Sequence, residues 1–227
     1  NESNDNTKDV LQPYIDQNIV EYIYYPGKVQ QLNAYNDAIK KHKKECRYIA
    51  FMDMDEFIMP TIPFKPIYQI ISEQIEKSKG GAAGIGVNWA IFGTSGHTKK
   101  PEGLVTKNFI KRGINGHWAN YHIKTICNPR MIDYYISPHY PIYKLGAYSI
   151  NDSDGSRLWG WFCHEVKYET LRINHYFTKS EEEYKKKHAR GLADRNQLYN
   201  FHEMFIQYNL NDIEDYSMYQ YIKLLYP

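Results

Sequence analysis

The chain has 227 residues, of which 42% are hydrophobic and 24% charged, and its formal net charge at pH 7 is +2. This length is enough for one α/β domain with a substantial core, and the near-neutral charge gives no general reason to expect nucleic-acid binding. No apolar run reaches the roughly 18–20 residues that a membrane-spanning helix needs. The sequence is therefore typical of a globular domain that binds a smaller ligand.

The first sixty residues predict alternating helices and strands. A helix begins near Thr7, and residues 20–25 alternate between apolar and polar side chains as a short strand does. Residues 30–45 have helical spacing, and an apolar strand follows from Tyr48. This order is typical of a parallel sheet with right-handed crossovers, and it predicts an α/β fold. Four apolar residues of the first helix are expected to face the core: Val10, Leu11, Tyr14 and Ile15.

The rest of the chain continues this alternation without a repeat or a clear linker. A helix is expected over residues 67–79, and residues 82–89 form a small, apolar run that suits a buried strand. Short strands are expected at 109–112, 122–127, 131–136 and 173–177, and a last helix at 212–226. Ser180 and Glu183 have the spacing of a capping box, which predicts a charged helix from Ser180 onward.

The most informative motif is Asp53-Met54-Asp55-Glu56, at the end of the apolar run 48–52. Neighbouring carboxylates repel one another and resist burial, so something must compensate for their charge. Carboxylate oxygens are hard ligands that suit Mg²⁺ or Mn²⁺, and such ions are commonly held together with substrate phosphates. The motif thus predicts a metal–diphosphate site, although solvated loop carboxylates or a helix cap have the same pattern. Glu56 is a third ligand, a base or a partner for a basic residue.

Four motifs follow one another in a fixed order along the chain. They are Asp53-Met54-Asp55-Glu56-Phe57, Asn88-Trp89-x-x-Phe92-Gly93-Thr94-Ser95-Gly96, Lys124-Thr125-Ile126-x-x-Pro129, and Asn174-His175-Tyr176-x-x-Lys179-Ser180. In this order they resemble glycosyltransferase family 92 and related family-2-like bacterial glycosyltransferases. The resemblance covers about residues 1–215, nearly the whole chain.

The resemblance implies a GT-A fold, with a Rossmann-like, mostly parallel sheet flanked by helices. It also implies a metal-dependent, inverting transfer from a nucleotide sugar, with UDP-sugars favoured, to a saccharide or lipid-linked acceptor. Residues 1–227 would form one such domain, with 1–60 in the nucleotide-sugar half and 61–227 in the acceptor half. The Asn-Glu motif and the terminal Asp that usually precede this region in the group do not occur here. We therefore expect an N-terminally truncated sheet that lacks its first strand or strands; a nucleoside pocket that is built differently is the alternative.

In this pattern Asp53 and Asp55 hold Mn²⁺ or Mg²⁺ on the diphosphate, and Asp53 also belongs to the donor site. His175 is a candidate third ligand, because it lies at a predicted strand end; a core histidine bonded to a backbone carbonyl is the alternative. Lys179 begins a helix, whose N-terminal N–H groups attract phosphate, and Lys28 follows a Pro-Gly turn. Both lysines are candidates for the donor diphosphate, and an exposed lysine is the alternative at Lys28.

Proton transfer from the acceptor needs a base, and Glu56 and Glu165 are the preferred candidates. The candidates for acceptor binding are Trp89, Gly93, Trp159 and Trp161. Indole rings stack on sugar faces, and a core tryptophan is the alternative for each of them. Gly93 belongs to a loop whose backbone N–H groups can approach a sugar, and a plain turn is the alternative there. Five further residues are titratable groups that an open cleft can expose, namely His97, His139, Asp152, Asp154 and His164.

Two other function classes are compatible with paired aspartates: a metal-dependent phosphoryl-transfer or hydrolytic enzyme, and a non-catalytic sugar-binding module of the same fold. The first predicts a nucleophile or extra acidic ligands beside the pair, and neither a phosphate loop nor a His-rich metal cluster occurs in the sequence. Three widely spaced cysteines favour a reducing compartment over a disulfide framework. Together with the resemblance, they predict a cytoplasmic protein, with peripheral association at the inner face of a membrane.

Overall fold

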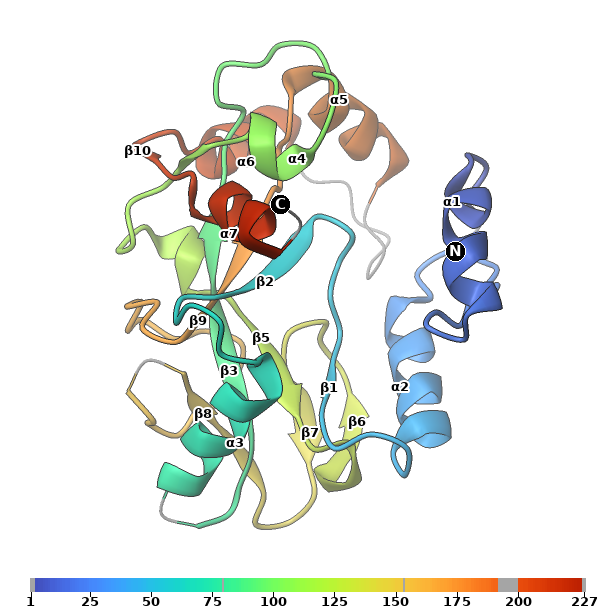
Figure 1. Cartoon of the computed structure of the whole chain (residues 1–227), viewed down its shortest axis with the longest axis vertical. Helices are drawn as coiled ribbons and strands as arrows, with labels where there is room; N and C mark the ends of the chain where they lie inside the picture. Colours follow the sequence, from blue (N-terminus) through green and yellow to red (C-terminus); the bar gives the residue numbers. More distant parts are fainter. Residues whose placement is uncertain (1–2, 79, 153, 192–199, 226–227) are drawn as a thin grey trace.

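A six-stranded sheet forms the centre of the molecule in the computed structural model, which describes residues 3–78, 80–152, 154–191 and 200–225 (Figure 1). Five strands follow the order β1-β5-β3-β9-β2, and β8 pairs with β3 beside them. Their bounds are β1 (Ile49–Ala50), β2 (Glu56–Pro60), β3 (Ala82–Ile91), β5 (Ile123–Cys127), β8 (Tyr148–Asn151) and β9 (Leu171–His175).

The sheet is mixed, and the prediction of a mostly parallel sheet is wrong. Strand β3 runs parallel to β8 and β9, whereas the pairs β1–β5, β3–β5 and β2–β9 are antiparallel. The prediction relied on alternating helices and strands, but β2 follows β1 after a turn of a few residues without a crossover helix. The α/β class itself is confirmed, because helices and one central sheet make up the fold.

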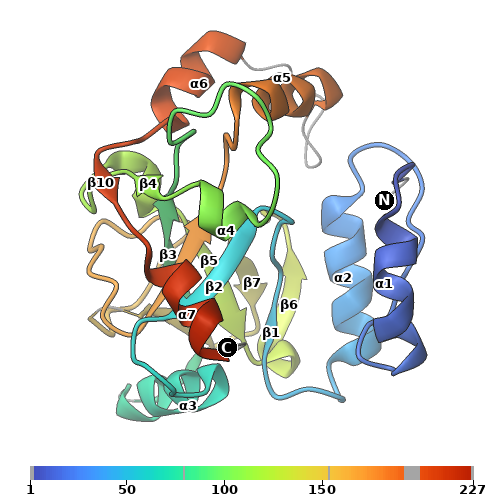
Figure 2. The ribbon, with the colours of Figure 1, turned by 45° about the horizontal axis from the view of Figure 1, so that its top comes forward.

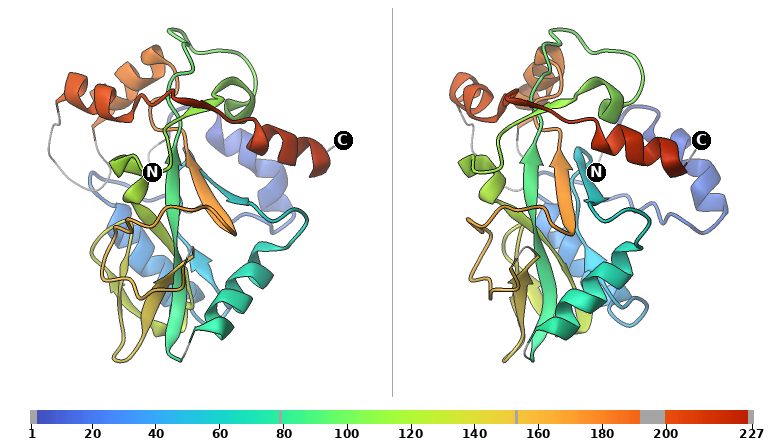
Figure 3. Two further views of the ribbon diagram at one scale, coloured as in Figure 1. Left: turned by 90° about the vertical axis from the view of Figure 1, so that its left-hand side faces the viewer. Right: turned by 60° about the vertical axis from the view of Figure 1, so that its left-hand side comes forward.

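Strand β3 lies in the middle of the sheet and pairs with β5, β8 and β9 (Figure 3). Nine of its ten residues are buried. A side chain at Gly84 would overlap Cys127 of β5, and one at Gly86 would overlap Ile123. The small residues of this strand therefore let β5 approach closely. On one face the helix α3 (Ile67–Lys77) covers the strands with Ile70 and Ile71, which are 1% and 2% exposed.

Further helices lie at both ends of the sheet (Figure 2). Helix α5 (Glu181–Arg190) begins with the predicted capping box between Ser180 and Glu183, so this prediction is confirmed. Helix α6 (Phe201–Tyr208) was not predicted, although Asn200 caps it by accepting bonds from the N–H groups of residues 202 and 203. Two shorter helices are α4 (Val105–Asn108) and α7 (Ser217–Leu225). The predicted helix ends at residues 79 and 226 lie outside the described residues.

The N-terminal region differs most from the prediction. Helix α1 (Thr7–Asp16) forms as expected, but it has no buried residue, and Val10 and Tyr14 are 59% and 50% exposed. Residues 20–25 form no strand in the part of the chain that the structure describes. Helix α2 (Gln31–His42) lies beside α1 and buries Ile39 (Figure 2).

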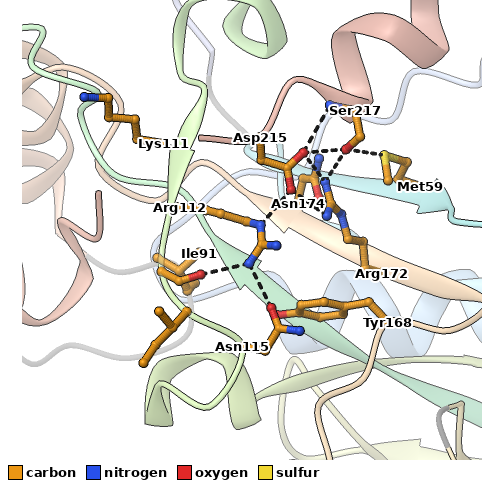
Figure 4. A network of polar contacts seen from close by, with 12 residues as sticks. Met59, Ile91, Lys111, Arg112, Asn115, Tyr168, Arg172, Asn174, Asp215 and Ser217 are labelled. Carbon is orange, nitrogen blue, oxygen red and sulfur yellow. Dashed lines mark hydrogen bonds and ion pairs between the residues drawn. The ribbon is translucent and has the colours of Figure 1, made fainter. Parts of the chain in front are cut away.

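Two small sheets complete the fold. Strands β6 (Ile132–Tyr135) and β7 (Pro141–Tyr143) pair as a hairpin, and β4 (Lys111–Arg112) pairs with β10 (Ile213–Glu214). Directly after β10, Asp215 bonds to Arg112 and Arg172 and so ties the end of the chain to the sheet (Figure 4). Among the described residues, no helix is long and apolar enough to cross a membrane.

Candidate active site

The acidic motif forms the turn between β1 and β2. The N–H group of Glu56 donates to the carbonyl oxygen of Asp53 at 2.9 Å and closes this turn. Met54 is 90% exposed, whereas the side chains of Asp53 and Asp55 are only 35% and 14% exposed. The turn therefore directs both carboxylates toward the protein and the residue between them toward solvent.

Asp53 is held by two donors from distant parts of the chain. Gln31 of α2 donates to its Oδ1 at 2.7 Å, and the Lys124 ammonium of β5 donates to its Oδ2 at 3.1 Å. The same ammonium lies 3.3 Å from Oε2 of Glu56. Lys124 and Glu56 are enclosed, with side chains 1% and 0% exposed. Burial opposes the charge on Lys124, but Glu56 and Asp53 together keep its pKa above the ordinary value.

Asp55 also has two partners from distant parts of the chain. The Lys187 ammonium of α5 donates to its Oδ2 at 2.7 Å, and Nε2 of His175 lies 3.5 Å from its Oδ1. Burial by itself would raise the pKa of Asp55, but His175 and Lys187 hold that pKa well below its usual range. The Asp55 carboxylate is consequently ionised at neutral pH.

Beneath the two aspartates lie buried polar atoms that have no hydrogen-bond partner among the described residues. They are Oε1 of Glu56, Nδ1 of His175 and Nε1 of Trp89. The first two are 4.0 Å apart, and burial raises the pKa of Glu56 although His175 and Lys124 oppose that rise. These three belong to seven such atoms among the described residues, and each atom of this kind in a folded protein calls for an explanation such as a functional role.

The predicted role of Glu56 changes with this geometry. Its side chain is completely enclosed beneath Asp53 and Lys124, and its Oε2 accepts from the N–H group of Asp53 at 2.9 Å. A base must come within hydrogen-bond reach of the acceptor hydroxyl. Glu56 instead positions the turn and the Lys124 ammonium.

A row of aromatic side chains extends from the acidic turn to the surface. We call Trp118, His122, Trp161 and Phe162 the aromatic rim. Its three largest rings are 42%, 46% and 43% exposed, and the ring of His122 lies 4.4 Å from that of Phe162. The N–H group of residue 123 donates to the carbonyl oxygen of Trp161 at 3.1 Å, so the rim flanks the strand that carries Lys124.

The four predicted acceptor residues fall into different environments. Trp89 is 5% exposed, and its ring stacks on His122 at 4.8 Å, so it supports the aromatic rim from behind. A side chain at Gly93 would overlap the carbonyl oxygen of Leu210, which explains the glycine by close packing. Trp161 belongs to the rim. Trp159 is 82% exposed and lies on Arg157, at 4.2 Å from its guanidinium carbon.

The predicted phosphate-binding lysines are not among the cations that contact the acidic turn. Lys28 is exposed, three residues before Gln31. Lys179 precedes the N-cap of α5 with a left-handed φ of 50°. The N–H groups of Glu181 and Glu182, at the start of α5, already donate to the carbonyl oxygens of residues 97 and 98. Three glutamates in the first turn further disfavour an anion there.

The other titratable candidates are spread over the molecule. Glu165 has a side chain that is 60% exposed, and it lies 3.8 Å from Lys167 in the loop that follows the aromatic rim. Asp152 is buried, and burial raises its pKa to about 6, although Thr170 and the N–H group of Leu171 donate to its carboxylate. His97 bonds to the carbonyl oxygen of Asn108, and His139 bonds to that of Ile123. The ring of His164 lies against that of Tyr121. Asp154 accepts a hydrogen bond from the N–H group of Ser156.

The carboxylate oxygens of Asp53 and Asp55 are hard ligands, the type that divalent cations such as Mg²⁺ and Mn²⁺ prefer. Each carboxylate offers about four lone-pair positions, and the described contacts use two of them on each residue. No group of three His, Cys, Asp or Glu side chains that could hold a metal occurs among the described residues. A metal at Asp53 and Asp55 would therefore take its other ligands from substrate phosphates, as Mg²⁺ sites with one or two carboxylates do. With that addition, the pair fits Mn²⁺ or Mg²⁺.

Comparison with known proteins identifies one family. The sequence model of glycosyltransferase family 92 matches residues 1–213. This range includes the acidic turn and the four elements that supply the partners of Asp53 and Asp55, namely α2, β5, β9 and α5. No curated protein matches the chain.

Proposed function

Because the chain belongs to glycosyltransferase family 92 and is therefore a glycosyltransferase, we propose that its acidic turn binds the diphosphate of a nucleotide-sugar donor. The resemblance found from four ordered motifs is thereby confirmed at the level of the family. The finer reading includes a GT-A arrangement, a UDP-sugar donor, inversion at the anomeric carbon and a dependence on metal. The following observations support the diphosphate-binding and acceptor-binding parts of this proposal, whereas the GT-A arrangement, the UDP-sugar donor and inversion rest on the resemblance.

The observation that carries the proposal is the convergence of four segments on Asp53 and Asp55. Helix α2, strand β5, strand β9 and helix α5 each contribute one partner to these two carboxylates. A turn that served only to connect β1 and β2 would not need Gln31, Lys124, His175 and Lys187 around it. When bound, Mn²⁺ or Mg²⁺ supplies Lewis-acid stabilisation of the leaving diphosphate, which is worth several kcal/mol.

The chain's own residues would divide the remaining tasks. Lys124 and Gln31 hold Asp53 in place, and Glu56 fixes the backbone of the turn from below. Because Asp55 stays ionised beside His175 and Lys187, it is available as a hard ligand at neutral pH. Preorganisation of this kind avoids rearrangement of the site during the reaction.

The acceptor is proposed to bind along the aromatic rim, as a saccharide or a lipid-linked saccharide. A sugar ring has an apolar face and polar edges, and exposed indole rings such as Trp161 match both. Glu165 is the better candidate for the base, because it is exposed and follows the rim by a few residues. The proposed setting is the cytoplasm at the inner face of a membrane, and the three cysteines are free thiols, which agrees with a reducing compartment.

The test is donor cleavage by the full chain with a panel of nucleotide sugars, in the presence of Mn²⁺ or of EDTA. We expect EDTA and the Asp55→Asn variant each to reduce turnover by roughly a thousandfold, which corresponds to about 4 kcal/mol. Asp37→Asn is the matched control, because Asp37 is 56% exposed and pairs with Lys40 on the surface of α2. Circular dichroism would verify that each variant is folded. Full activity in EDTA, or an active Asp55→Asn protein, would refute the metal-assisted reading.

A further inference from the structure

Lys187 is placed at Asp55 by the way α5 packs. Tyr184, which is 0% exposed, anchors the helix in the core, and Lys187 lies three residues later on the same helical face. Its neighbour Lys186 faces away, with a side chain that is 72% exposed and a surface pair to Glu182. A single lysine of the run 185–187 is therefore directed at the acidic turn.

The surroundings of Lys187 hold its ammonium at a defined point. Besides Asp55, it donates to the carbonyl oxygen of Phe177 at 3.1 Å, and it lies 3.8 Å from the centre of the Phe177 ring. The side chain is 23% exposed, so the ammonium is neither buried nor free in solvent. An ammonium has three N–H donors, and the hydrogen bonds described for Lys187 use two of them. One donor remains for an oxygen that approaches from solvent.

Helix α5 does not need this ion pair to stay in place. Its first turn is fixed by the capping box and by the bonds of Glu181 and Glu182 to the carbonyl oxygens of residues 97 and 98. Tyr184 adds the buried anchor in the core. A purely structural role for Lys187 would therefore duplicate contacts that the helix already has.

The charges around the turn give Lys187 a task in ligand binding. A diphosphate is repelled by the two ionised aspartates, and it needs cations on its own side of the turn. Lys124 is 1% exposed and already lies between Asp53 and Glu56, so it is committed to the interior. Of the two lysines, Lys187 is the partly exposed one, with a side chain that is 23% exposed, and it bonds to Asp55.

We propose that Lys187 is a phosphate-binding residue of the donor site, which Asp55 holds in position before the donor arrives, and that it competes with a divalent cation for that carboxylate. This inference rests on the proposed function. The inference extends the proposed function, because it assigns diphosphate binding to Lys187 of α5 rather than to the predicted Lys28 and Lys179. The ligand class is a diphosphate ester, for which inorganic pyrophosphate is the simplest probe.

The experiment compares the wild-type chain with Lys187→Gln, using Mn²⁺ alone and then pyrophosphate in the presence of Mn²⁺. Without the competing ammonium, Mn²⁺ alone should bind the variant about fivefold more tightly, as measured by electron paramagnetic resonance of the free ion. Pyrophosphate should bind the variant about tenfold more weakly in calorimetry, because a charge-assisted hydrogen bond is lost. The two affinities thus change in opposite directions, which loss of structure alone would not produce.

Two matched variants complete the design. Lys186→Gln removes a lysine from the exposed face of the same helix and should change neither affinity by more than about twofold. Lys187→Arg keeps the charge and should retain pyrophosphate binding within about threefold. If Lys187→Gln changes only the melting temperature and leaves both affinities unaltered, the inference is wrong while the proposed function stands. If the wild-type chain binds neither Mn²⁺ nor pyrophosphate, both fail.

Discussion

The buried ion pairs of Asp215 make the sharpest prediction about stability (Figure 4). Its carboxylate accepts from Nε of Arg112 at 2.7 Å and from both terminal nitrogens of Arg172, at 2.8 and 3.0 Å. The three side chains are only 8%, 11% and 6% exposed. Burial would raise the pKa of Asp215, but hydrogen bonds and charge from Arg172, with help from Ser217 and Arg112, hold that pKa well below its usual range.

The perturbation is Asp215→Asn, which keeps the shape of the side chain and removes its charge. Two buried guanidinium groups are then left without their common partner. Removing one member of a buried ion pair typically costs about 3–5 kcal/mol, because the remaining charge is uncompensated. For a chain of this size, that loss corresponds to a decrease of roughly 6–20 °C in Tm.

The assay is urea unfolding followed by the fluorescence of the four tryptophans. Glu214→Gln is the matched control, because Glu214 is adjacent, 58% exposed and 3.9 Å from Lys111. Such a surface pair contributes about 1 kcal/mol at most. If the free energy of unfolding of Asp215→Asn lies within about 1 kcal/mol of that of the wild type, the ion pairs do not hold the end of the chain to the sheet.

The pH dependence gives a second check on the same reasoning. Because the folded-state pKa of Asp215 is depressed, its contribution to the free energy of unfolding is fully present above the unfolded-state pKa, near 3.8. That contribution decreases as the pH falls further toward the folded-state pKa. The difference in stability between the wild type and Asp215→Asn should thus be constant from pH 5 to pH 7 and narrow below about pH 4. A difference that widened in acid would contradict the sign of the shift.

Two predictions concern catalysis with a saccharide acceptor panel. Trp161→Ala should raise the acceptor KM by roughly tenfold, because about 1.4 kcal/mol of stacking is lost. Donor cleavage in the absence of acceptor should be unchanged. An unaltered acceptor KM would show that Trp161 is not part of the acceptor site. Glu165→Gln should lower kcat by about a hundredfold or more without weakening donor binding, because a general base contributes that much; a fully active variant would assign proton transfer to another group.

Local signals in the sequence predicted local structure well. The capping box of Ser180 and Glu183 set the start of α5, and the small apolar residues of β3 indicated a buried strand with a close neighbour. The missed helix α6 also had a local signal, since Asn200 is a favourable N-cap residue before an apolar run. Better use of capping would have found it.

Features that depend on distant partners were predicted poorly. The alternation of residues 20–25 suits a strand, but a strand needs a neighbour to pair with, and the described structure provides none there. The direction of β2 is set by its pairing with β9, more than one hundred residues later in the chain. Helix α1 has an amphipathic pattern without a buried face, so periodicity predicted the helix and not its packing.

The candidate site shows the same division between local and distant information. The sequence identified Asp53 and Asp55, and His175 as their neighbour, but it did not associate Lys124 and Lys187 with them. Lys124 had a usable signal, because a lysine between apolar residues of a buried strand must find an ionic partner. Lys187 had almost none, since only its spacing from Tyr184 distinguishes it from the two lysines before it.

These two lysines change the argument for a metal. From the sequence, the adjacent carboxylates needed an external cation, because nothing nearby in the chain compensated for their charge. In the folded chain, Lys124 and Lys187 supply that compensation from 71 and 132 residues away. The charge of the acidic pair is therefore compensated without metal, and a divalent cation bound there as proposed would have to displace an ammonium or share a carboxylate with it. Metal binding at this turn should consequently be weak alone and strong with a diphosphate, whose oxygens receive the displaced lysine.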